Sequence, residues 1–143
     1  MEIRKADPED LEVIKEIADL LYIEMPDFVW NAGDFIKKQI ERGEYFVAEE
    51  NGKAVGVISL RERNGMMYIE TLAVSKDIQA KGFGSKLVEF AKQFARKNGF
   101  VVLRTTSFYE YGVKDYWLKQ GFRLLDEPGE YGGHKFHRFE FEI

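Results

Sequence analysis

The chain has 143 residues, of which 45% are apolar and 32% charged, with a formal net charge of −4 and no cysteine. This length fits one domain, so we expect a single domain over residues 1–143, and the composition is too apolar for a disordered chain. The lack of cysteine excludes a disulfide scaffold, cysteine-ligated zinc and a thiol nucleophile. The acidic balance argues against a nucleic-acid partner, because phosphate binding needs a basic stripe.

The apolar stretches of the chain bear on its location. The longest of them, such as residues 55–60, are too short to cross a bilayer. Residues 1–5 lack the apolar core of a secretory signal. We therefore expect a cytoplasmic protein with no membrane partner.

The first half of the chain predicts a strand, two helices and a run of strands. A short strand covers residues 2–5, and Asp7 followed by Pro8 predicts a helix start, since aspartate caps free N–H groups and proline suits the first helical position. Asn31 predicts the cap of a second helix that ends before Gly43. Three strands joined by two Asn-Gly turns then follow. They cover residues 45–50, 53–63 and 66–74.

The second half predicts a long amphipathic helix between two strands. Apolar residues recur at helical spacing from Leu87 to Ala95, and an Asn-Gly pair ends the helix. A strand, a shorter helix and two closing strands follow. They cover residues 100–106, 110–120, 122–126 and 135–142. A helix that joins two strands predicts a right-handed parallel crossover. The fold class is therefore α/β with a mixed sheet, in the order β-α-α-β-β-β-α-β-α-β-β.

The segment QAKGFGS, residues 79–85, lies between a strand and the long helix. The first turn of a helix has unpaired N–H groups and a partial positive charge, and glycines let a phosphate approach them. Lys81 adds a formal charge, so the segment predicts a pyrophosphate site; a glycine-rich connection without a ligand is the alternative. The third glycine of the dinucleotide fingerprint is absent, and the order Gly84-Ser85-Lys86 excludes a P-loop.

The run IETLAVS at residues 69–75, this loop and the helix after it resemble the coenzyme A signature of the GNAT superfamily of N-acetyltransferases. The stretch YWLKQGF at residues 116–122 resembles a second motif of that family, and the order of elements is similar to the GNAT fold along the whole chain. The resemblance implies that the fourth and fifth strands, at the centre of the sheet, splay apart. It also implies direct transfer of an acetyl group from acetyl-CoA to a primary amine of a small molecule or peptide.

The resemblance further implies where acetyl-CoA, the cosubstrate, binds. The backbone of the fourth strand pairs with the pantetheine arm, and the glycine loop with the helix start holds the pyrophosphate. The residues so implied are Leu72, Ala73, Val74, Gln79, Ala80, Lys81, Gly82, Phe83, Gly84 and Ser85.

Two residues are candidates for proton transfer. Glu70 lies beside the implied splay and is the candidate base; a solvated or salt-bridged strand residue is the alternative interpretation. The family often has a tyrosine near the leaving sulfur, four residues before the Gly-Phe pair, where this chain has Trp117, which cannot act as an acid. Tyr116 is therefore the candidate acid, although one step along a helix turns a side chain by about 100°.

The apolar side chains between the first two helices, including Met25, Phe28 and Trp30, have two interpretations. The resemblance implies that they wall the acceptor pocket, and ordinary core packing is the alternative. His134 and His137 lie in a predicted strand whose side chains alternate between faces, so they point to opposite sides and we expect no metal site.

Two alternatives to the enzyme remain open at this point. One is a non-catalytic acyl-CoA-binding or sensing domain of the same fold. The other is a small α/β module that binds another anion or nucleotide at the helix start alone. A homodimer also remains open.

Overall fold

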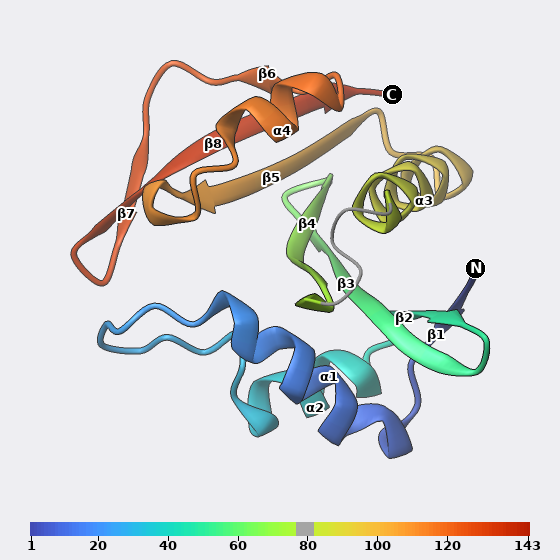
Figure 1. The fold of residues 1–143 in the computed structure, drawn as a ribbon. Helices are drawn as coiled ribbons and strands as arrows, with labels where there is room; N and C mark the ends of the chain where they lie inside the picture. Colours follow the sequence, from blue (N-terminus) through green and yellow to red (C-terminus); the bar gives the residue numbers. More distant parts are fainter. Residues whose placement is uncertain (77–81) are drawn as a thin grey trace.

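The computed structural model of the chain describes residues 1–76 and 82–143 (Figure 1). Its helices and strands follow one another in nearly the order that the sequence predicts. In chain order they are β1 (Glu2–Lys5), η1 (Pro8–Asp10), α1 (Leu11–Ala18), η2 (Asp19–Leu21), α2 (Gly33–Glu41), β2 (Tyr45–Glu50), β3 (Lys53–Arg63), β4 (Met66–Val74), α3 (Phe83–Lys97), β5 (Val102–Phe108), η4 (Tyr109–Tyr111), α4 (Lys114–Lys119), β6 (Arg123–Leu124), β7 (Gly129–Tyr131) and β8 (His134–Glu142).

The strands form one mixed sheet in the order β1-β2-β3-β4-β5-β8-β6, and β7 pairs with β8. β4 and β5 are parallel and are joined through α3, while the other neighbours are antiparallel. The predicted mixed α/β fold and its crossover helix are therefore confirmed. Figure 1 shows α1 and α2 on one side of the sheet and α3 on the other. None of the helices in the described ranges is long and apolar enough to cross a membrane.

A β-bulge in β4 changes which face of the sheet the side chains of this strand point to. Ser59 pairs with Thr71 and the next residue of β3, Leu60, pairs with Ile69, so Glu70 is the extra residue of β4. Ile69 packs in the apolar cluster under α3, whereas Ala73 packs in the cluster under α1 and α2. In a regular strand these two side chains would share a face, so the bulge reverses the alternation.

The pairing between β4 and β5 ends close to this bulge. It runs from Met67–Leu103 to Ile69–Thr105, and the Thr105 hydroxyl donates a hydrogen bond to the Ile69 carbonyl at 3.1 Å. Beyond that point β4 continues along β3 and β5 continues along β8. The splayed central pair implied by the family resemblance is thus present, and the bulge lies where the two strands diverge.

The structure differs from the sequence prediction mainly after α3. β5 begins and ends two residues later than predicted. Residues 109–111 then form a short 3-10 turn, and Gly112 adopts φ +63°. This delays α4, which covers Lys114–Lys119 instead of residues 110–120. β7 was not predicted, since its residues pair with β8 only after a glycine-rich turn reverses the chain.

The two predicted helix caps have opposite outcomes. Asp7 does cap: its side chain accepts a hydrogen bond from Glu9 N–H at 3.0 Å, and Asp10 completes a reciprocal capping box. Asn31 does not cap α2, whose N-cap is Ala32. The Asn31 amide instead donates to the Asp19 carboxylate at 2.9 Å, which ties the segment between the helices to the end of α1.

Candidate active site

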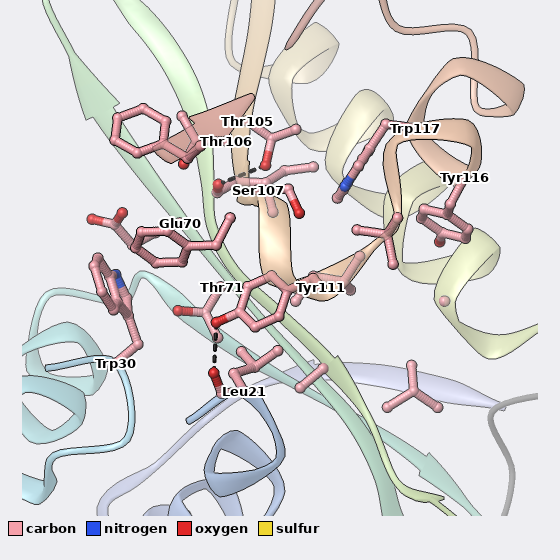
Figure 2. Close-up of a pocket in the computed structure, with 18 of the residues that line it drawn as sticks. Leu21, Trp30, Glu70, Thr71, Thr105, Thr106, Ser107, Tyr111, Tyr116 and Trp117 are labelled. Carbon is pink, nitrogen blue, oxygen red and sulfur yellow. Dashed lines mark hydrogen bonds between the residues drawn. The ribbon is translucent and has the colours of Figure 1, made fainter. Parts of the chain in front are cut away.

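A cavity of about 970 Å³ lies where β4 and β5 diverge. Its lining comes from the start of α3, the bulged half of β4, the end of β5, α4, the segment between α1 and α2, and the β7–β8 hairpin. Figure 2 shows Tyr116 and Trp117 on one side of this cavity and Trp30 on the opposite side, with Glu70 nearer to Trp30. The splay therefore creates one continuous space between two chemically different ends.

The first end is the start of α3. Gly82 is the N-cap residue and adopts the left-handed conformation at φ +77°. Apart from its chain neighbours, no atom of the described residues lies within 4 Å of the position of an added Cβ. The N–H groups of the first turn, from Phe83 to Ser85, have no partner within the helix and lie at its positive end. The Phe83 side chain is buried in the core, so only its backbone can face a ligand. This end suits an anion.

The predicted cosubstrate residues upstream of α3 are only partly described. Leu72, Ala73 and Val74 line the cavity. On the other side of the strand, Leu72 pairs with Ile58 and Ala73 with Val57 of β3, so the cavity lies along the opposite edge of β4. The remaining predicted residues, Gln79, Ala80 and Lys81, lie outside the described residues.

Glu70, the extra residue of the bulge, lines the cavity and its side chain is only 13% exposed. Its carboxylate oxygen Oε1 contacts Arg63 Nη2 at 2.5 Å and Arg61 Nη1 at 3.6 Å. Both arginines come from β3, the strand that pairs with β4. The salt-bridged alternative therefore describes this side chain, and at the same time the bulge turns it toward the cavity.

The side chain of Tyr116, on α4, reaches the start of α3, even though Tyr116 is one residue away from the position that the tyrosine usually takes in the family. A Cβ placed on Gly84 would lie 2.9 Å from Tyr116 Oη, so the absence of a side chain at Gly84 is what admits the hydroxyl. Burial raises the pKa of the Tyr116 hydroxyl, and the neighbouring Ser85 hydroxyl opposes that shift. The phenol therefore keeps its proton at neutral pH.

Trp117 is mainly a core residue. It is 5% exposed, and its ring centroid lies 5.1 Å from that of Phe122 and 6.2 Å from that of Phe139. The two neighbours on α4 thus divide two tasks: Tyr116 reaches the start of α3, and Trp117 packs α4 onto the sheet.

The second end of the cavity is aromatic. Trp30 packs edge to face against Phe108, with ring centroids 5.8 Å apart, and against Tyr131 at 5.2 Å. The cavity-wall interpretation of Trp30 is therefore the one that the geometry supports, and Phe28 packs behind it at 5.1 Å. No local sequence pattern marks Phe108 or Tyr131 as part of this end, since both approach Trp30 only after the sheet has formed.

The two histidines lie at the outer side of this aromatic end. His134 Nδ1 contacts the Glu110 carboxylate, and the His137 ring stacks on Tyr109 with centroids 4.2 Å apart. In the part of the chain that the structure describes, no group of three or more potential ligands is placed to hold a metal ion.

The model of the acetyltransferase (GNAT) family matches residues 14–122. The chain therefore belongs to the acetyltransferase (GNAT) family, which confirms the resemblance found in its sequence. Two curated relatives are named N-acetyltransferases.

These relatives are the uncharacterized N-acetyltransferase YvbK from Bacillus subtilis and an uncharacterized N-acetyltransferase from Archaeoglobus fulgidus. The first is 34% identical over 89 residues, which are 62% of this chain and 54% of that protein. The second is 26% identical over an alignment of 143 positions, which covers 90% of this chain and 97% of that protein. The chain thus spans about half the length of the Bacillus relative, and it spans 8% of another curated relative that it matches.

Among solved structures, the PaiA N-acetyltransferase from Thermoplasma acidophilum in complex with coenzyme A has a similar fold. The TM-score is 0.79 with 21% sequence identity, over 98% of both chains. At this identity the likeness concerns the fold alone.

Proposed function

We propose that this chain transfers the acetyl group of acetyl-CoA to a primary amine of a small molecule or peptide. The observation that carries the proposal is that one continuous cavity joins the start of α3 to the bulge of β4. An anion site, a strand edge, a carboxylate and a protonated phenol thereby share one space. Acetyl-CoA supplies the activated acetyl group, and the chain supplies the groups that bind both substrates and move protons.

The α3 end fits the cosubstrate. The first-turn N–H groups from Phe83 to Ser85 suit a pyrophosphate, because they are fixed donors at the positive end of a helix. Gly82 has no side chain to obstruct that approach, and none of the described residues beyond its chain neighbours lies within 4 Å of where its Cβ would be. The cavity edge of β4 around Leu72 suits the amide groups of a pantetheine arm, which can add to a strand edge as another strand does.

Glu70 is proposed as the group that takes the proton from the acceptor. A primary amine is mostly protonated at neutral pH and must lose a proton before it can attack the acetyl carbonyl. Arg63 and Arg61 both contact Oε1 of Glu70, so they orient the carboxylate while Oε2 is the oxygen that can receive the proton, directly or through water.

Tyr116 is proposed as the acid that protonates the departing sulfur of coenzyme A. Its hydroxyl lies against Gly84 at the start of α3, on the cosubstrate side of the cavity. Because burial raises its pKa, the proton is present across the neutral range and is available for donation.

The test combines binding and turnover. Acetyl-CoA in hundredfold excess over its dissociation constant should stabilise the protein by about 2.7 kcal/mol, and ATP or NAD should not. A thiol reagent should then report coenzyme A release that depends on an added amine. Stabilisation by acetyl-CoA without release of coenzyme A would favour the non-catalytic acyl-CoA-binding alternative. No stabilisation by acetyl-CoA would contradict the proposal.

A further inference from the structure

We propose that the acceptor is a small monoamine with an aromatic or apolar body, in preference to an amino acid, a polyamine or a peptide terminus. This rests on the proposed function, because it takes Glu70 as the group that receives the amine. The inference comes from the rings, the charges and the closure of the end of the cavity opposite α3.

The rings form a continuous wall around Phe108. Its ring centroid lies 5.8 Å from those of Trp30 and Tyr111 and 6.0 Å from that of Phe136. Tyr131 joins the wall through Trp30 at 5.2 Å. All five side chains line the cavity. A wall of this kind gains most from burying a flat apolar group, which can pack edge to face or offset against the rings.

The tyrosine hydroxyls of this wall already have partners. Tyr111 Oη donates to the Leu21 carbonyl at 2.6 Å, and Tyr131 Oη donates to the Asp27 carbonyl at 2.7 Å. Figure 2 shows the first of these bonds, with the Tyr111 hydroxyl turned to the backbone. The two tyrosines therefore present mainly their rings to a ligand, so they add apolar contact and little polar recognition.

The charges point the same way. Among the described lining residues, the charged side chains are Arg63 and Glu70, and they pair with each other. The carboxylate of an amino acid would have to compete with Glu70 for Arg63, and the second ammonium of a polyamine would meet no carboxylate other than Glu70 among these residues. Burying such a charge without a counterion is unfavourable, so the body of the acceptor should be uncharged.

At the aromatic end of the cavity, two segments of the chain meet and bridge its far side. The segment between α1 and α2 meets the β7–β8 hairpin through the Tyr131–Asp27 hydrogen bond and the Trp30–Tyr131 ring contact. The position of an added Cβ on Gly132 lies 3.0 Å from Met25 Sδ, so the two segments also touch at the turn. A polypeptide acceptor needs a path for the rest of its chain, and these contacts favour a molecule small enough to be enclosed.

The test compares kcat/KM for acceptors that differ in one feature. With acetyl-CoA saturating, 2-phenylethylamine should exceed L-phenylalanine, which adds a carboxylate, by tenfold or more. It should likewise exceed 1,4-diaminobutane, which replaces the ring with a second ammonium, and a tripeptide that begins with phenylalanine. A charged or peptide acceptor that matches or exceeds 2-phenylethylamine overturns the inference.

A pair of variants adds a structural control. Trp30→Ala should lower kcat/KM for 2-phenylethylamine by about tenfold to a hundredfold, and that for ethylamine much less, because only the larger amine reaches the ring. Tyr22→Ala removes an aromatic side chain from the same segment that is 54% exposed and does not line the cavity. Its ring contacts Phe28, with centroids 5.3 Å apart, so any small loss through Phe28 should be equal for the two amines. Equal losses for both amines in Trp30→Ala would overturn the inference.

The outcomes also separate this inference from the proposed function. Transfer to some other amine, with normal stabilisation by acetyl-CoA, contradicts the inference alone. No stabilisation by acetyl-CoA and no transfer to any amine contradicts the proposed function, and the inference fails with it.

Discussion

The two ends of the cavity are built from different parts of the chain. The α3 end depends on backbone N–H groups and on two glycines within three residues, Gly82 and Gly84. The opposite end depends on side chains from the α1–α2 segment, β5, the turn after it and the β7–β8 hairpin. The hydrogen bond that joins two of these parts, from Tyr131 to Asp27, spans 104 positions of the chain. One end is therefore local in sequence and the other is assembled by the fold.

This difference decides which end of the cavity a sequence motif can mark. A backbone site needs glycines and a helix start at fixed spacing, so it leaves a short motif. A wall of side chains needs only that apolar rings meet in space, and many sequences can achieve that. Variants at each end should accordingly change different measurements.

The largest effect on turnover is expected at the bulge. Glu70→Gln should lower kcat by about a hundredfold to ten-thousandfold, the range for loss of one acid–base group. Stabilisation by acetyl-CoA should stay the same, because Glu70 lies away from α3. Glu62→Gln is the matched control, since Glu62 is exposed and outside the cavity lining. An unchanged rate in Glu70→Gln would move the base to water or to the acceptor.

The largest effect on stability is expected at Trp117, whereas a change at its neighbour Tyr116 should affect turnover more than stability. Trp117→Ala should reduce the free energy of unfolding by about 3–5 kcal/mol, because a large buried ring leaves the core. Tyr116→Phe should keep most of the stability and reduce kcat. Chemical denaturation and steady-state rates measured on both variants check this division, and a normal kcat in Tyr116→Phe would leave the sulfur without a dedicated acid.

Gly82→Val tests the anion site with a control at the other end of the same helix. A β-branched residue at φ +77° is strained and fills the approach to the first turn, so the stabilisation by acetyl-CoA should disappear. Gly99 follows α3, adopts φ +79° and likewise has no atom within 4 Å of an added Cβ. Gly99→Val should lower the melting temperature to a similar extent and keep the stabilisation. Loss of the ligand effect in both variants would point to strain alone.

The smallest effect is expected at the contact between Gly84 and Tyr116. Gly84→Ala should destabilise the protein by about 1–3 kcal/mol, because its Cβ meets the Tyr116 hydroxyl and the ring must shift. The same substitution in Tyr116→Phe should cost less, since the hydroxyl is then absent. A double-mutant cycle of unfolding free energies measures the coupling, and additive effects would show that the two residues act independently.

Much of the fold follows from local sequence. The Asn-Gly pairs at residues 51–52 and 64–65 adopt positive φ as hairpin turns require, and the periodicity of residues 87–95 matches the buried face of α3. The parallel crossover and the splay follow from this order of elements together with the family motif. The glycines at the start of α3 also stand where the motif implies, although their role as the cosubstrate site remains a proposal.

The tertiary structure alone decided the rest. One step along a helix changes direction by about 100°, so only packing could decide that Tyr116 reaches Gly84 while Trp117 enters the core. The bulge at Glu70, the β7 strand and the aromatic wall around Phe108 depend on contacts between residues far apart in the chain. Local propensity and spacing do not predict those contacts, because the contacts form only when the sheet and both helix layers are in place.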